Sequence, residues 1–216
     1  MSARPANRNP DRTRRRLLQA AVRLFSARGY HGASVDQIVA AARVNKRMVY
    51  HYFGSKEAIY RAALLDVYNR IVAAEFHATE SDASPHDKLT RLLRNYFDFL
   101  DENPEFTQLI QWENAERGKH IAKQKQLLSK DPFLERFRQI VREGMTSGQF
   151  RQDLNIPHLL IHCIGLCFIY HSNRFSLSQG LSMDLGDRNE RQKGLNQILT
   201  LIFEGIRAPD KPASIA

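Results

Sequence analysis

Basic and hydroxyl side chains gather in residues 43–56, and their chemistry is suited to recognising a polyanion. Arg43, Lys46 and Arg47 lie within five positions of one another, and Tyr50 follows them. Lys46 and Arg47 offer cationic N–H donors that match the O6 and N7 acceptors of guanine in the major groove. The hydroxyl of Tyr50 is a group that more often donates to a phosphate oxygen. The segment therefore predicts contact with DNA rather than a reaction.

Two short helices joined by a tight turn would place these side chains on one surface. Ser34 and Gln37 form an S-x-x-Q capping box, which predicts that the first helix begins there. Its expected buried face consists of Val35, Ile38, Val39 and Ala42. Asn45 is a favourable N-cap for a second helix at 46–52, with Val49 facing inward. This arrangement predicts a helix-turn-helix whose second helix reads base edges from its first turn.

The basic residues of the chain are concentrated in its first quarter. Residues 1–56 contain twelve Lys and Arg against two Asp and Glu, whereas residues 57–216 contain twenty against twenty-one. The sequence pI of about 9.8 therefore originates in the segment that contains the two expected helices. Such a cluster neutralises phosphates and releases their counterions. A solubilising basic tail would explain Arg4, Arg8 and Arg12, but it would not explain the cations inside the helical motif.

A further pattern of small, apolar and aromatic positions reaches back to residue 14. Its members are Arg16-Leu17-Leu18, Ala20-Ala21, Leu24-Phe25, Gly29-Tyr30, Ser34-Val35, Ile38, Ala41, Val44, Tyr50-His51-Tyr52-Phe53 and Ser55-Lys56-Glu57. This pattern resembles the DNA-binding domain of the TetR/AcrR family of bacterial transcriptional regulators. The resemblance implies that Tyr50 and Lys56 contact phosphates, and Lys56 also lies at a helix N-terminus, where backbone amides favour an anion. We expect Ser34 and Tyr52 to hold phosphates as well.

The turn between the two helices departs from the family's pattern at Arg43, where the family often has glycine. Glycine tolerates a positive φ without cost and arginine does not, so we expect a tighter, right-handed turn here. The side chain of Arg43 is then a candidate phosphate contact, with a solvated position as the alternative.

Apolar residues recur at helical spacing along the whole chain, and no segment reads as a strand. Further helices are expected up to Gly29 and at 56–77, 86–102, 104–117, 119–130, 132–147, 157–177 and 188–206. The expected fold class is all-α, with an N-terminal three-helix helix-turn-helix domain and a C-terminal helical domain that the resemblance assigns to ligand binding and dimerisation. The expected boundaries are a disordered basic arm at 1–10, the DNA-binding domain at 11–56, the C-terminal domain at 57–207 and a tail at 208–216.

The resemblance also implies a homodimer, because in this family the last two long helices pair with those of a second subunit. The helix expected at 157–177 is apolar around most of its circumference. The helix at 188–206 carries Leu195, Ile198, Leu199, Ile202 and Ile206 at helical spacing. The alternative is that both helices only form the core of their own domain. A dimer would favour a palindromic double-stranded DNA operator.

In the family that the chain resembles, a small-molecule effector enters the C-terminal domain and shifts the shared helix at 56–77. Ligand pockets combine apolar walls with a few polar groups. On this basis the candidate pocket residues are Tyr96, Phe99, Trp112, Glu113, Arg117, His120, Cys163, Tyr170 and Phe175. Ordinary roles stay open for all of them: Glu113 and Arg117 could be an exposed helical pair, and the aromatic residues could be core.

Metal binding and catalysis are weaker readings of the sequence. His158 and His162 recur at i, i+4, as do Cys163, Cys167 and His171, and either set could supply half of a metal site. The alternative is that these are buried or hydrogen-bonded structural residues, and we expect no metal and no cofactor. The sequence has no Gly-rich phosphate loop, nucleophile elbow or paired-carboxylate motif, so an enzyme is not expected.

The most apolar stretch, Leu159 to Tyr170, is short of the roughly 20 residues that span a bilayer, so no membrane partner is expected. The two cysteines provide no disulfide framework, and we expect a cytoplasmic protein. The favoured function is a homodimeric repressor released from its operator by a small-molecule effector of unidentified chemistry. The alternatives are a DNA-binding protein of the same fold without such an inducer, in an architectural or protein-regulated role, and an activator.

Overall fold

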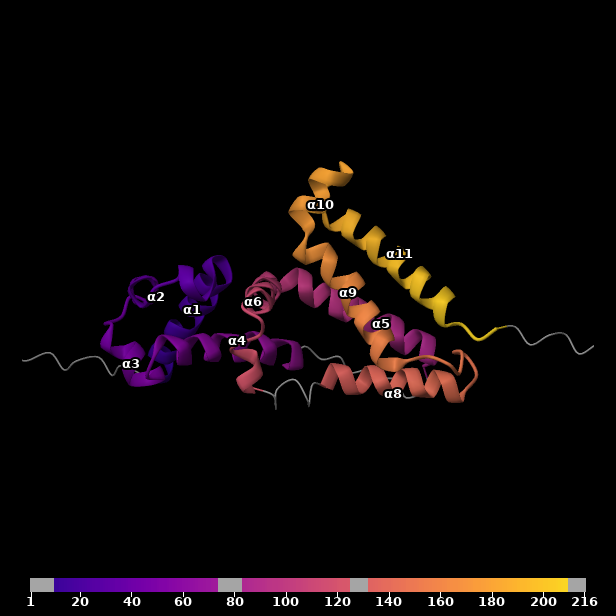
Figure 1. The fold of residues 1–216 in the computed structure, drawn as a ribbon, viewed down its shortest axis with the longest axis horizontal. Coiled ribbons are helices and arrows are strands. Elements are labelled where there is room, and N and C mark those ends of the chain that lie inside the picture. The colour runs from indigo at the N-terminus through magenta and orange to yellow at the C-terminus, as the bar shows by residue number, and fades with distance from the viewer. Residues whose placement is uncertain (1–9, 74–82, 125–131, 210–216) are drawn as a thin grey trace, which may run out of the picture. The chain divides into compact units, whose positions relative to one another are not determined.

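The computed structural model describes residues 10–73, 83–124 and 132–209, and every regular element within these ranges is a helix. Outside the helices, an isolated β-bridge joins Phe150 to Arg207. The predicted all-α fold class is therefore confirmed. The chain divides into two compact units, Met1–Ala73 with Asn103–Ser129 and Ala74–Glu102 with Lys130–Ala216 (Figure 1). Most of the arm and of the tail predicted from the sequence lies outside the described residues.

The first unit is built around its longest helix. It comprises α1 (Pro10–Gly32), α2 (Val35–Ala42), α3 (Arg47–Phe53), α4 (Lys56–Ala73), α6 (Pro104–Ala115) and the 3-10 helix η1 (Ile121–Gln124). α1 contacts α2, α3, α4 and α6. The completely buried side chains here include Leu17, Phe25, Ile38, Val49, Ile59 and Leu109. This unit thus contains α4 and α6 as well as the N-terminal helices. The boundary predicted at residue 56 stays a prediction of where the DNA-binding region ends.

Side-chain caps fix where the helices of the first unit begin. Ser34 Oγ accepts the Gln37 N–H at 3.2 Å, and Gln37 Oε1 accepts the Ser34 N–H at 3.0 Å, so the predicted capping box is present. Asn45 Oδ1 accepts the Arg47 N–H at 2.9 Å at the start of α3. Ser55 Oγ accepts an N–H of the first turn of α4 at 3.0 Å. Each cap supplies an acceptor for a donor that has no partner within its helix.

Gly29 interrupts α1 and allows α6 to approach it closely. Its φ of 68° and ψ of 179° are non-helical, so α1 kinks here and continues to Gly32, whereas the sequence predicted an end at Gly29. A β-carbon on Gly29 would lie 2.8 Å from the Trp112 ring of α6. The Trp112 indole N–H also donates to the carbonyl oxygen of Ser26 at 3.0 Å. The contact between the two helices therefore depends on the absence of a side chain at Gly29.

We expect Gly29→Ala to lower the free energy of unfolding by about 3 kcal/mol. The substitution adds the strain of a positive φ and also overpacks the Trp112 ring, and each effect costs about 1–3 kcal/mol. Gly54→Ala is the matched control, because Gly54 has a φ of 81° but nothing lies within 4 Å of its added β-carbon. Denaturant titration of both variants separates the two effects. Equal losses would show that the contact with Trp112 contributes nothing.

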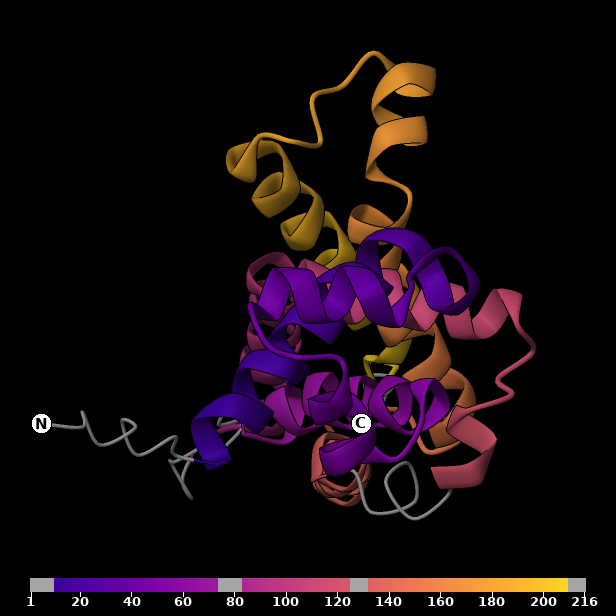
Figure 2. The same cartoon turned by 90° about the vertical axis from the view of Figure 1, so that its left-hand side faces the viewer.

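The second unit packs four of its helices on a common core and leaves the fifth outside it. It comprises α5 (Pro85–Glu102), α8 (Pro132–Thr146), α9 (Ile156–Ser172), α10 (Arg174–Leu181) and α11 (Arg188–Ile206). α5 contacts α8, α9 and α11. The core includes Leu89, Leu93, Phe97, Phe137, Cys163 and Leu195. α10 buries no residue, and both views show it at the end of α9 that is far from α8 (Figures 1 and 2).

The helix predicted at 119–130 is wrong in its first part. After α6 the chain passes through Arg117 and Gly118, whose φ values are 57° and 68°, and only the four-residue η1 follows. The Glu113 carboxylate accepts the N–H groups of His120 and of the next residue, each at 3.0 Å. These bonds satisfy the backbone donors in a turn and so remove the advantage of a continuing helix. The rest of the predicted range lies outside the described residues.

The single helix predicted at 157–177 is also wrong, because Asn173 divides it into α9 and α10. Asn173 has a φ of −112° and a ψ of 12°. Its carbonyl oxygen accepts the N–H of Leu177 at 2.9 Å, so a new helix begins there. Its side-chain oxygen accepts the Ser172 hydroxyl at 2.7 Å. Local side-chain bonds of this kind compete with a continuous helix. The dimer interface that was predicted for the helix at 157–177 is therefore now a prediction about α9.

Candidate nucleic-acid interface

α3 has one apolar face against the core of the first unit and one polar face in solvent. Val49 is completely buried, as predicted. Arg47 is exposed, and Tyr50 is 51% exposed. The Asn45 cap binds the backbone N–H of Arg47 and so fixes the first turn of the helix, from which the Arg47 side chain projects. A short helix anchored along one side and open along the other can enter a major groove about 12 Å wide.

The turn between α2 and α3 is left-handed at Arg43, so the predicted right-handed turn is wrong. Arg43 has φ and ψ values of 51°. Its N–H donates to Ala40 O at 3.1 Å, and the N–H of Val44 donates to Val39 O at 3.1 Å. These two bonds have the pattern of a Schellman cap. They offset the strain of about 1–2 kcal/mol that a left-handed conformation imposes on a residue with a β-carbon.

Arg16 of α1 braces the same turn, a role that the sequence analysis missed. Its guanidinium donates to the carbonyl oxygen of Ala42 and, at 3.5 Å, to that of Arg43. A cation in this place satisfies carbonyl groups at the end of α2 and complements the helix dipole. The sequence analysis named Arg16 only as a member of the family's pattern, and its partner Ala42 lies 26 positions away. Arg16 thus supports the turn that leads into α3.

Lys46 is paired with a carboxylate of α2. Its Nζ lies 2.9 Å from Asp36 Oδ1 and 3.1 Å from Oδ2. The hydrogen bond with Asp36 and the charge of Asp36 raise the pKa of Lys46. Both side chains are exposed, so salt screens the pair and an acceptor on DNA can compete with Asp36.

Arg47 is the cation of α3 best placed to read a base. Within the described part of the chain, its guanidinium has no hydrogen-bond partner, ion pair or ring contact, and its backbone N–H donates to Asn45. A bidentate donor of this kind gives up no protein partner when it binds O6 and N7 of guanine. Binding to a base would therefore cost Arg47 less than Lys46, which would first have to leave Asp36.

The candidate phosphate contacts border this face with different local partners. Ser34 Oγ is used in the cap of α2. Tyr52 is partly buried, and its ring centroid lies 4.8 Å from that of the preceding residue. Lys56 Nζ lies 4.6 Å from the centroid of the Tyr30 ring, and burial lowers the pKa of Lys56. All seven residues predicted to contact DNA belong to the first unit, and their contacts with DNA stay predictions.

Four candidate pocket residues, Trp112, Glu113, Arg117 and His120, also belong to the first unit. Glu113 Oε1 lies 2.8 Å from His120 Nδ1, and both residues are 1% exposed. The His120 ring packs on a tyrosine of α1 and on a tyrosine of α4, with centroids 4.9 Å and 4.8 Å away. Arg117 is exposed on the turn after α6. Trp112, Glu113 and His120 thus tie α6 to its neighbours, and a contact with an effector stays a prediction.

The other five candidate pocket residues belong to the second unit and have different environments. Tyr96 and Phe99 of α5 are buried, and Cys163 of α9 is completely buried. Tyr170 is partly buried on α9. Phe175 of α10 is 74% exposed. The five candidates of this unit therefore differ in their surroundings, and the role of all nine in binding a ligand stays a prediction.

The metal half-sites considered in the sequence have no further support. In residues 10–73, 83–124 and 132–209, no group of three or more His, Cys, Asp or Glu side chains could hold a metal ion. Cys163 and Cys167 are free thiols, and burial raises the pKa of each to about 12. Burial also lowers the pKa of His171 to about 4. Within the three described ranges, no helix is both long and apolar enough to cross a membrane.

Comparison with known proteins identifies the family. Residues 17–63 match the model of bacterial regulatory proteins of the tetR family, and residues 85–202 match that of the tetracyclin repressor-like C-terminal domain. The chain is 35% identical over 198 residues to the HTH-type transcriptional repressor NicS of Pseudomonas putida, covering 91% of this chain and 93% of that protein. It is 29% identical over 161 residues to the HTH-type transcriptional repressor SCO4008 of Streptomyces coelicolor, covering 74% and 79%.

A solved structure of similar fold is the transcriptional regulator FadR from Bacillus subtilis in complex with stearoyl-CoA. The similarity covers 90% of this chain and 100% of that chain, with a TM-score of 0.69 and 22% sequence identity. Both family models and the long match to NicS agree with the helix-turn-helix surface described above. The chain therefore belongs to the TetR family of bacterial regulatory proteins and is a DNA-binding transcriptional regulator.

Proposed function

We propose that the protein is a homodimeric repressor that binds a two-fold symmetric site in double-stranded DNA and leaves it when a small molecule binds. The observation that carries the proposal is the exposed face of α3, where Arg47 and Tyr50 project from a helix whose other side is buried. Lys46 leaves Asp36 and binds a second base, and Lys56 binds a phosphate. Because its partner is genomic DNA, we place the protein in the cytoplasm.

The proposed dimer forms through α9 and α11. α9 contains no Asp, Glu, Lys or Arg in its 17 residues. Ile161 and Leu201 are nevertheless 62% and 65% exposed, and Leu166 and Ile169 are 36% and 42% exposed. An exposed apolar face of this kind supports pairing with the same face of a second copy. Two-fold pairing would present two α3 helices to two half-sites.

The proposed signal reaches α3 through α6 and α4. Arg70 of α4 lies 3.7 Å from Glu105 of α6, and Trp112 ties α6 to α1. α4 in turn contacts α3. An effector that displaces α6 would therefore move the helices that support the recognition face. The sequence analysis gave this role to the shared helix at 56–77, and the proposed route adds α6.

The test is selection of genomic DNA fragments by the purified protein, followed by sequencing. We expect one enriched sequence made of two inverted half-sites, and we expect the genes beside it to indicate the class of effector. Arg47→Ala should lose the enrichment while the protein still binds DNA. Recovery of fragments without a common sequence would overturn the proposal.

A further inference from the structure

α10 lies outside the core of the second unit and carries exposed apolar side chains. Phe175 is 74% exposed, Leu181 is 59% exposed and Met183, just after the helix, is 41% exposed. No residue of α10 is buried. Apolar side chains gathered in this way on a projecting helix indicate that another surface covers them.

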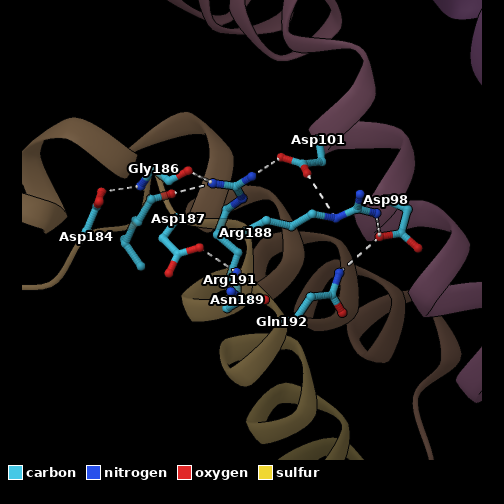
Figure 3. A network of polar contacts seen from close by, with 10 residues as sticks. Asp98, Asp101, Asp184, Gly186, Asp187, Arg188, Asn189, Arg191 and Gln192 are labelled. Atoms are coloured by element: carbon cyan, nitrogen blue, oxygen red, sulfur yellow. Dashed lines mark hydrogen bonds and ion pairs between the residues drawn. The ribbon is translucent and has the colours of Figure 1, made fainter.

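The loop that follows α10 is held by Arg191 of α11 (Figure 3). Arg191 of α11 is 6% exposed, and its guanidinium donates to Leu185 O at 2.7 Å, to Gly186 O at 2.8 Å and to Asp101 Oδ1 at 2.5 Å. The N–H of Leu185 donates to the hydroxyl of Ser178 on α10 at 3.1 Å. α5, the loop before α11 and α10 are thus linked by hydrogen bonds. The end of α10 is therefore connected, through this loop, to α11 and α5.

The second unit also has an apolar groove of about 440 Å³ between α9 and α11. Its lining includes the apolar residues Leu159, Leu166, Leu201, Ile202 and Ile206 and the polar residues His158 and His162. On α9 these residues lie between His158 and Leu166, and on α11 they belong to the last half of the helix. The groove therefore lies toward the start of α9 and the end of α11. The ribbon shows α10 at the other end of this helix pair (Figures 1 and 2).

A two-fold axis brings these two opposite ends together. At about 1.5 Å per residue, His162 lies about 10 Å before Ile169 along α9, and Ser172 at the end of α9 lies about 5 Å beyond it. Phe175 follows three residues later, in α10. An axis perpendicular to α9 near Ile169 therefore carries the α10 of each copy to the groove of the other. The exposed residue Ile169 then meets its own copy at the centre, as an isologous interface requires.

We propose that α10 of each protomer inserts into the α9–α11 groove of its partner, with Phe175 as the anchor. The occupant is a second copy of this chain, because one chain supplies both the projection and a groove of matching apolar character, and the two-fold pairing closes both contacts at once. The inference rests on the proposed dimer and specifies its geometry.

The direct test is cross-linking with a short bismaleimide in the full-length protein. The double variant Phe175→Cys/His162→Cys should yield a covalent dimer, whereas neither single variant should, because like positions lie on opposite sides of the axis. The native Cys163 and Cys167 are completely buried, and their raised pKa keeps the thiols protonated, so the unmodified chain is the blank. A dimer that cross-links no better in the double variant than in the single variants would overturn the insertion.

A second measurement separates this inference from the dimer itself. Phe175→Asp should raise the dimer dissociation constant at least tenfold in sedimentation equilibrium, whereas Ser176→Asp, which places the same charge on another side of α10, should change it little. An unchanged dimer dissociation constant for Phe175→Asp would rule out the insertion of α10 but not the dimer. A monomeric unmodified protein would overturn both.

Discussion

Replacing Arg47 by alanine is expected to weaken binding to the cognate DNA by about 1–3 kcal/mol and to relax the preference at one base position. Arg47 projects from the first turn of α3, its backbone is fixed by Asn45, and its guanidinium has no partner among the described residues. The free side chain can therefore give both of its N–H donors to one guanine. Fluorescence anisotropy with the cognate duplex and with single-base variants at constant salt measures the effect.

Lys56→Ala is the matched control for base recognition. The Lys56 ammonium packs on Tyr30 at the border of the recognition face, where it can hold a phosphate. Its loss should weaken cognate and random DNA alike and reduce the salt dependence of binding by about one phosphate contact. If Arg47→Ala behaved in the same way as Lys56→Ala, Arg47 would not read a base.

The largest expected loss of stability comes from Glu113→Ala. Glu113 is 1% exposed, and its carboxylate accepts two backbone N–H groups and faces His120 Nδ1 at 2.8 Å. The substitution leaves those buried donors without acceptors, and breaking a buried pair of this kind costs about 3–5 kcal/mol. For a chain of this size the corresponding fall in Tm is about 10 °C. Differential scanning calorimetry measures it.

Two variants show whether the loss is specific to the buried carboxylate. Glu113→Gln keeps the volume and one oxygen acceptor, so its loss should be clearly smaller. Glu116→Ala removes a neighbouring carboxylate that lies 3.5 Å from the exposed His31, and it should cost no more than about 1 kcal/mol. Equal losses from Glu113→Ala and Glu116→Ala would contradict the structural role given to Glu113.

The recognition helices could be predicted because their determinants are local. The pair Ser34 and Gln37, the cap at Ser55 and the inward Val49 each act within one turn of helix, and the structure confirms all of them. Arg43 shows where a local rule failed. Its own preference disfavours a left-handed turn, but two backbone bonds at the end of α2 and the guanidinium of Arg16 favour it.

The surroundings of the candidate pocket residues could not be predicted because they depend on contacts between distant segments. Trp112 bonds to Ser26, 86 positions earlier, and fits beside α1 only because Gly29 has no side chain. Glu113 looked like the partner of Arg117 at helical spacing, but the chain leaves the helix at Arg117 and returns His120 to the carboxylate. Spacing along one helix cannot show such a return of the chain.

The most direct test of the central claim is a hydroxyl-radical footprint of the purified protein on a genomic fragment that it selects. Two α3 helices related by a two-fold axis should protect two half-sites of inverted sequence, about one helical turn apart on one face of the duplex. Arg47→Ala should lose this pattern at concentrations at which Lys56→Ala merely requires more protein. Uniform protection along the fragment, or one protected half-site without a symmetric mate, would contradict sequence-specific binding by a dimer.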